Sequence, residues 1–288
     1  MEEIAQQVFI EQCFSGVVTG ALKLHRGLII IDSPCRPDEW KAWQKKLIHL
    51  GSGAAQLMIL LDTHPDRLLN MPPIEAPILV QENALEIFHN LPIATRPLEK
   101  PSTLEPEPDD MPQQTRWSLP DLCYTQQISL YWDDEPVVVT HQPGAHLAGS
   151  WVRYETEKVI FIGDSVVVNQ PPFLAWCSID RWIEELTWLG SDFFKHHKII
   201  SGRDGVISQR SINNMVKFLF HLKEVVSELL LMDDPDKDIV QELPGLLKYF
   251  HFERELKEQY QKRLSEELHL LLKRLKTDRM QGESHADE

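Results

Sequence analysis

Metal-ligand-type side chains follow one apolar run at short, regular spacing. The run Leu57–Leu61 is followed by Asp62, His64 and Asp66 at positions i, i+2 and i+4, and then by Arg67. Because side chains of an extended segment alternate between two sides, the first three point to the same side if the strand geometry persists. Carboxylates and neutral imidazoles bind zinc or iron-type ions, whereas a guanidinium offers no lone pair. The stretch indicates either a metal site at a strand end or an ordinary polar loop.

Polar side chains also follow later apolar runs. The loop after the run 137–140 carries His141 and His146, and Asp164 and Arg203 each follow a further apolar run. Open α/β sheets build their sites in loops at the ends of strands. A loop histidine is nonetheless more often only solvated, and an aspartate at a strand end can cap a helix or form a turn. These positions become a site only if the fold brings them to one edge.

The intervening segments predict a layered α/β architecture. Apolar and β-branched runs predict strands, and apolar residues recurring every three to four positions predict helices. The Pro-rich, acidic segment 91–116 is expected to be an exposed loop, and the chain from residue 208 onward is helical in pattern. Strands are expected at 8–10, 17–24, 28–31, 57–61, 76–80, 122–125, 127–131, 137–140, 151–154, 158–162 and 198–200, and helices at 40–50, 82–89, 178–189, 212–232, 239–250 and 253–275.

The composition is that of a globular protein, with 42% hydrophobic and 25% charged residues in a chain of 288. The formal net charge of −15 repels phosphate backbones, so a nucleic-acid partner is not expected. The sequence contains no signal-peptide pattern and no apolar run of membrane-spanning length, so we expect no membrane partner. Four cysteines without a C-x-x-C pair favour a reducing compartment, and we expect the protein to be cytoplasmic.

In order and spacing, the motifs resemble those of the metallo-β-lactamase superfamily. The family's H-x-H-x-D-H motif is matched with Asp62 in place of the first histidine and Arg67 in place of the last. His146 fits the family's histidine loop, P-G-H-T-P-G-S, with one residue inserted, and Phe161–Asp164 is similar to F-x-G-D. Arg203 stands where the last motif, P-G-H, has its histidine.

The resemblance implies a four-layer αββα metallo-β-lactamase sandwich with a C-terminal helical extension. On this basis, residues 1–207 form the metallo-β-lactamase-like domain, 208–276 form the helical extension, and 277–288 form a disordered tail. The extension could pack over the site or provide the interface of a homodimer.

The resemblance also implies which residues would hold a first metal. Carried over by position, they are Asp62, His64 and His146, with Asp164 as a further carboxylate if its bridging role is kept. One carboxylate and two imidazoles can hold a divalent ion with an open position for water. Zinc is expected in the first place, with manganese and iron as alternatives, and the absence of any metal is the other outcome.

The second metal of the family is expected to be absent. Its site would retain Asp66 and Asp164, but Arg67 and Arg203 replace its two histidines. Arginine remains protonated and cannot ligate a metal. Two guanidiniums can instead neutralise the two carboxylates, so the sequence predicts arginine–aspartate ion pairs at this position.

Two functions are consistent with this degenerate site. The first is a hydrolase that uses at most one divalent metal to activate water against an ester, thioester, lactone or phosphoester. In it, Asp66 or Asp164 would accept a proton, and Arg67 or Arg203 would bind an anionic group of a small-molecule substrate. The second is a non-catalytic ligand-binding or interaction protein on the same fold. A nuclease is disfavoured, because phosphodiester cleavage usually relies on two metal ions.

Overall fold

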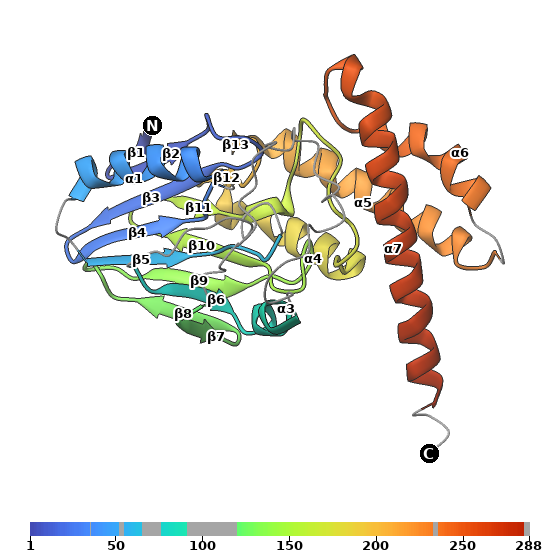
Figure 1. Cartoon of the computed structure of the whole chain (residues 1–288), viewed down its shortest axis with the longest axis horizontal. Helices are drawn as coiled ribbons and strands as arrows, with labels where there is room; N and C mark the ends of the chain where they lie inside the picture. The colour runs from blue at the N-terminus through green and yellow to red at the C-terminus, as the bar shows by residue number, and fades with distance from the viewer. Residues whose placement is uncertain (35, 52–54, 65–75, 91–119, 233–235, 285–288) are drawn as a thin grey trace.

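Two β-sheets packed face to face, with helices on both outer sides, form the body of the protein (Figure 1). The structure is a computed structural model and describes residues 1–34, 36–51, 55–64, 76–90, 120–232 and 236–284. The Pro-rich segment 91–116 and the residues Asp66 and Arg67 lie outside these ranges.

Seven of the described strands form the first sheet. Strands β1 to β4 pair antiparallel, whereas β4 to β7 pair parallel to their neighbours. The spatial order follows the chain: β1 (Glu2–Ala5), β2 (Val8–Glu11), β3 (Thr19–Leu24), β4 (Gly27–Ile31), β5 (Ala55–Ile59), β6 (Ile78–Gln81) and β7 (Leu122–Tyr124).

The second sheet contains six described strands. Strand β12 pairs parallel with β11, and the other neighbouring strands are antiparallel. Its spatial order is β13 (Gly205–Ile207), β12 (Lys198–Ser201), β11 (Val159–Phe161), β10 (Ser150–Tyr154), β9 (Val137–His141) and β8 (Gln127–Leu130).

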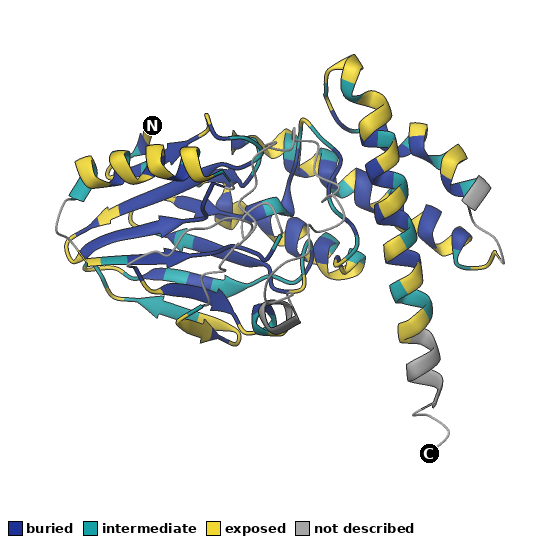
Figure 2. Cartoon of the chain, viewed as in Figure 1, coloured by how far each residue is buried: buried dark blue, intermediate teal, exposed yellow. Residues whose placement is uncertain are grey.

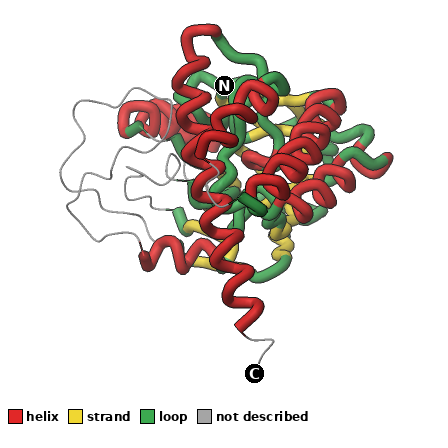
Figure 3. The backbone as a smooth tube through the Cα atoms, turned by 90° about the vertical axis from the view of Figure 1, so that its right-hand side faces the viewer, coloured by secondary structure: helices red, strands yellow, loops and turns green. Residues whose placement is uncertain are grey.

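Helices cover the outer face of each sheet. On the first sheet, the buried side of α1 (Pro37–Gly51) and the start of α3 (Asn83–Asn90) contribute to an outer core. On the side of the second sheet, α4 (Ile179–Leu189) and α5 (Gln209–Leu229) pack against each other, and α6 (Asp236–Leu247) and α7 (Lys257–Ser284) follow beyond the ends of the strands (Figure 1), on the side that faces the viewer in Figure 3. Short 3-10 turns occur at η1 (Gly163–Ser165), η2 (Asp192–Phe194) and η3 (Arg254–Leu256).

Alternation along the strands explains how one run supplies two cores. In β4, Ile29 and Ile31 pack between the sheets, whereas Leu28 and Ile30 pack against Trp43 of α1. Successive side chains of a strand point to opposite faces, so a strand buried on both sides is apolar at every position. One core between the two sheets and one further core on each outer side confirm the predicted four-layer αββα sandwich.

The helical extension shares its core with the second sheet. Trp151 and Ile160 of the sheet belong to the same buried cluster as Phe218 of α5, Leu246 of α6 and Leu268 of α7. Each of these helices has a buried side and an exposed side (Figure 2). The helices from residue 209 onward are therefore joined to the second sheet by one continuous buried cluster.

Several boundaries differ from the sequence predictions, and α5 and α6 each begin and end three residues earlier than expected. The edge strands β1 and β13 were not predicted, because both are short and only partly buried. Helix α7 continues to Ser284 rather than ending at residue 275, so residues 277–284 of the expected disordered tail are helical. Within the described part of the chain, none of the helices combines the length and hydrophobicity that a membrane span requires.

Candidate functional site

The candidate residues that the structure describes lie in loops at one end of the sandwich. Asp62 follows β5, His146 lies in the loop after β9, Asp164 lies in η1 after β11, and Arg203 follows β12. Backbone hydrogen bonds join these loops across both sheets: Ser150 N–H donates to Leu61 O at 2.8 Å, Gly202 N–H to Gly163 O at 2.7 Å, and Val18 N–H to Gly202 O at 2.8 Å.

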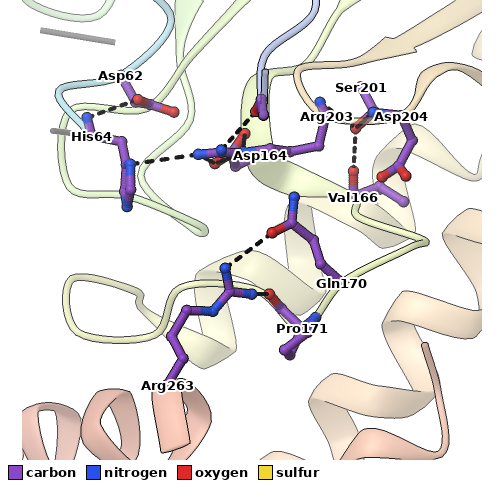
Figure 4. Close-up of polar contacts among 11 residues, drawn as sticks. Asp62, His64, Asp164, Val166, Gln170, Pro171, Ser201, Arg203, Asp204 and Arg263 are labelled. Carbon is purple, nitrogen blue, oxygen red and sulfur yellow. Dashed lines mark hydrogen bonds and ion pairs between the residues drawn. The ribbon is translucent and has the colours of Figure 1, made fainter. Parts of the chain in front are cut away.

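Arg203 and Asp164 form a buried ion pair at the centre of this end (Figure 4). The Nε of Arg203 donates to both carboxylate oxygens of Asp164, at 3.1 and 3.0 Å, and Nη2 donates to Oδ2 at 2.8 Å. The side chain of Arg203 is 3% exposed and that of Asp164 is 13% exposed. Charge-assisted hydrogen bonds of this kind are roughly twice as strong as neutral ones. The prediction that Arg203 pairs with Asp164 agrees with this geometry.

The remaining donors of Arg203 reach three other parts of the chain. Nη1 donates to the carbonyl oxygen of Gly16 at 2.7 Å, and Nη2 lies 3.5 Å from Nδ1 of His64. The guanidinium carbon also lies 5.2 Å from the ring centroid of Phe173, which is within the range of a cation–π contact. Arg203 thereby connects the loop before β3, the segment after β5 and the loop that carries Phe173.

Asp62 and Asp32 hold the backbone at the ends of neighbouring strands. Asp62 is buried, and its Oδ1 accepts the backbone N–H of His64 at 2.9 Å. Asp32, also buried, adopts φ of 55° and accepts the backbone N–H of Leu61 at 2.9 Å through Oδ1. Each carboxylate thus shapes the turn that delivers His64 to the site.

The imidazole of His146 accepts a hydrogen bond at Nδ1. The backbone N–H of Ala148 donates to Nδ1 at 3.1 Å, and Nε2 lies 3.4 Å from Oγ1 of Thr63. A backbone N–H can only donate, so Nδ1 carries a lone pair and the neutral ring has its proton on Nε2. Metal-bound histidines show the reverse arrangement, in which the second ring nitrogen donates its proton to an acceptor.

A divalent metal does not fit the described candidate ligands as they are arranged. No three carboxylate, imidazole or thiol donors among them lie within 4.8 Å of one another. The one described group that satisfies this distance, His25 with Asp133 and Asp134, lies at turns before β4 and β9, at the opposite end of these strands. In addition, a guanidinium faces Nδ1 of His64. Asp66 and Arg67, predicted for the second metal site, lie outside the described residues.

The carboxyl groups of Asp204, which is partly buried, and Glu185, which is buried, stabilise the surrounding loops. Asp204 accepts the backbone N–H groups of Val168 and Asn169 at 2.8 and 3.2 Å, and burial raises the pKa of its carboxyl. Glu185 of α4 accepts the N–H of Gly144, in the His146 loop, at 2.9 Å. Burial raises the pKa of Glu185 to about 8, because removal of the carboxyl from water outweighs the opposing effects of the Gly144 hydrogen bond and the charge of Arg181.

Phe173, which lies outside the sequence motifs, also contributes to the site. Its ring centroid lies 3.8 Å from that of His64, at an interplanar angle of 43°. Arg263 of α7 lies on the same ring, with its guanidinium carbon 4.4 Å from the centroid. A signal for Arg263 and Glu267 did exist in the sequence, since both are charged residues on the apolar face of an otherwise amphipathic helix.

Comparison with known proteins identifies the architecture. No protein-family model and no curated protein matches the sequence. A stereoselective inverting sec-alkylsulfatase from Pseudomonas sp. superposes with a TM-score of 0.68 at 11% identity, over 94% of this chain and 49% of that one. A metallo-beta-lactamase family protein from Thermus thermophilus gives 0.61 at 15% identity, over 94% and 95%. A metallo-beta-lactamase from Pontibacter korlensis gives 0.57 at 13% identity, over 76% and 97%.

The chain has the metallo-β-lactamase fold. The fold explains why Asp62, His64, His146, Asp164 and Arg203 come together from four separate loops. The match to the sulfatase covers about half of that protein, so the likeness concerns the sandwich and its C-terminal helices. Proteins at this level of identity share the fold, and their chemistry depends on the residues that each places at the site.

Proposed function

We propose that this protein is a non-catalytic ligand-binding or interaction protein on the metallo-β-lactamase fold. In this proposal, an arginine–aspartate ion pair takes the structural place of the metal centre. The expected ligand is a small molecule. The net charge of −15 opposes binding to nucleic acid.

The ion pair between Arg203 and Asp164 is the main support for this proposal. A divalent ion at this position would have to displace a guanidinium that makes three hydrogen bonds to the carboxylate. Removing one partner of a buried pair costs about 3–5 kcal/mol, so metal binding that separated them would have to offset that loss. The proton arrangement of His146 adds a further cost, because its Nε2 must lose a proton or its Nδ1 must lose the Ala148 hydrogen bond before it can ligate.

A hydrolase with one divalent ion is the second candidate. It is favoured by the contact between Thr63 and His146, which brings the segment containing Asp62 and His64 next to the histidine loop. A rearrangement of a few side chains would be required for these groups to converge on one ion.

Elemental analysis of protein purified without chelator distinguishes the two functions. The non-catalytic proposal predicts no stoichiometric zinc, manganese or iron, and an unfolding temperature that is unchanged by chelator. It also predicts only background hydrolysis of a panel of esters, thioesters, lactones and phosphoesters.

Matched variants make the metal measurement specific. About one equivalent of metal that is lost in both Asp62→Ala and His146→Ala, but retained in the exposed control His196→Ala, would contradict the proposal and support the hydrolase. Metal that is retained in all three variants would be bound elsewhere and would leave the site metal-free, as proposed.

A further inference from the structure

The loop at residues 170–177 brings Phe173 into the candidate site from the helical side. Phe173 lies on His64, with the centroids of the two rings 3.8 Å apart, and also contacts the guanidinium of Arg203. This loop has no regular secondary structure, so its position depends on hydrogen bonds from other elements.

Glu267 of α7 fixes the loop on the C-terminal side of Phe173. Its Oε2 accepts the backbone N–H groups of both Leu174 and Ala175, each at 2.8 Å. Glu267 is 5% exposed, and a carboxylate at that depth is stable only when hydrogen bonds compensate its charge. The two N–H groups therefore depend on Glu267, and Glu267 in turn depends on them.

Arg263, one turn earlier on the same face of α7, fixes the loop on the N-terminal side of Phe173. Its Nη1 donates to Oε1 of Gln170 at 3.0 Å, and its Nη2 donates to the carbonyl oxygen of Pro171 (Figure 4). Its guanidinium packs on the rings of Phe173 and Tyr260, at 4.4 and 5.1 Å from their centroids. Such contacts between a guanidinium and an aromatic face contribute about 0.5–2 kcal/mol, more when they are desolvated.

We propose that Arg263 and Glu267 are positioning residues that hold Phe173 against His64, so that the C-terminal helix forms a wall of the candidate site. The residues fixed by α7 lie two and three positions before Phe173 and one and two positions after it, which leaves its ring little freedom to leave His64. A ligand that approaches this face of the imidazole must displace Phe173, and α7 determines how easily that happens. The inference holds whether the site binds a ligand or hydrolyses one, so it does not depend on the proposed function.

NMR of the full-length protein labelled at histidine tests this assignment. A proton above an aromatic ring is shifted upfield, so the imidazole C–H signals of His64 report the position of Phe173. The variant His64→Gln identifies these signals, and Phe173→Leu defines their position when the ring is absent. We expect Glu267→Ala to move the His64 signals towards their Phe173→Leu position.

Two further variants of α7 make the test specific to the buried carboxylate. Glu267→Gln retains an acceptor oxygen for Leu174 and Ala175 and is expected to keep the His64 signals near their wild-type position. Glu266→Ala, which removes the exposed neighbouring carboxylate, is expected to leave them unchanged. His64 signals that stay at the wild-type position in Glu267→Ala overturn the proposal. An equal displacement of the His146 and His197 signals in that variant also overturns it, because the effect is then a general loss of structure.

Amide exchange of the wild-type protein provides a second test that does not require a variant to fold. The N–H groups of Leu174 and Ala175 are expected to exchange more slowly than those of an exposed turn such as Asp134. Exchange as fast as that of Asp134 would show that Glu267 does not fix the loop.

Discussion

The charge of Arg203 is buried together with its counter-charge. Its side chain is 3% exposed, and Asp164 supplies the carboxylate that compensates its charge. A buried pair of this kind is not by itself evidence of high stability, because desolvation of both ions offsets much of their attraction. Loss of one partner is costly, however, since it leaves the other charge buried without compensation.

Asp164→Asn is therefore expected to lower the free energy of unfolding by about 3–5 kcal/mol, as measured by chemical denaturation. The control is Asp180→Asn, which breaks the ion pair between Asp180 and Lys223. Both partners are exposed to solvent, with 69% of the Asp180 side chain and 51% of the Lys223 side chain accessible. That control is expected to change stability by no more than about 0.5 kcal/mol. Equal effects of the two substitutions would argue against a compensated buried charge at Arg203.

Glu185 predicts a dependence of stability on pH. Its pKa is about 8 in the folded protein, against an ordinary value of 4.5, so the folded state binds the proton more tightly than the unfolded state. Its contribution is fully present below about pH 4.5 and is lost as the pH rises to about 8 and above. The loss is on the order of 5 kcal/mol, at about 1.4 kcal/mol for each unit of pKa difference.

Glu185→Gln removes this titration while keeping an oxygen for the N–H of Gly144. Denaturation curves at several pH values are expected to show the wild type losing stability relative to this variant between about pH 5 and pH 8. The exposed neighbour Glu184, changed to Gln, is the control and should follow the wild type. A constant difference between wild type and Glu185→Gln over that interval would contradict the raised pKa.

Among contacts between single residues, the sequence predicted those whose two partners both belong to the family motifs. Asp164 and Arg203 are 39 residues apart, and their pairing was predictable only because each stands at a known strand end. The contacts of Glu267 with the 170–177 loop, 92 and 93 residues away, have no motif. The apolar stripe of α7 predicted which face is buried, but not what a charged residue on that face would meet.

Among the secondary-structure elements, the turn between β3 and β4 has the strictest steric requirement. Gly27 begins β4 with φ of +153° and pairs with Ala55 of β5. A Cβ at this position would lie 1.9 Å from the carbonyl oxygen of Ala55. The parallel pairing of β4 with β5, which leads directly to Asp62, therefore requires glycine here.

Gly27→Ala is expected to destabilise the protein by at least about 2 kcal/mol, because the backbone of β5 must move to make room. The control is Gly245→Ala in α6, where the nearest atom to a Cβ is a side-chain carbon of His221 at 3.3 Å. That substitution favours the helix and is expected to cost little or to stabilise. Thermal unfolding of both variants measures the difference, and similar midpoints would exclude a close approach at Ala55.

The sequence predicted the interior strands better than the edge strands. Strands β4 and β11 are buried on both faces and read as continuous apolar runs, which is a strong signal. Strand β1 begins with two exposed glutamates, so its sequence lacks the apolar run that predicts a strand. It lies at the edge of the first sheet, next to β2. Edge strands owe their existence to a neighbour rather than to their own pattern.

For the whole molecule, the sequence predicted the layers but not what the C-terminal helices pack against. The leucine side chains on one face of α7 could have been buried within the chain or against a second copy of it. In the structure Leu264, Leu268 and Leu271 are completely buried in the core that also contains Trp151 and Ile160 of the second sheet. A stripe identifies an apolar surface, whereas only the three-dimensional arrangement identifies what covers it.

That shared core has a consequence for biosynthesis. A ribosome extends the chain from its N-terminus, and the strands β10 to β12 emerge well before residues 264–272 of α7 have been made. During this interval the buried cluster that α5 and α6 share lacks the leucine side chains of α7, and the 170–177 loop lacks the two side chains that fix it. The nascent protein therefore presents an apolar surface for chaperones until residues 264–272 have been made, and the candidate site is completed only after that.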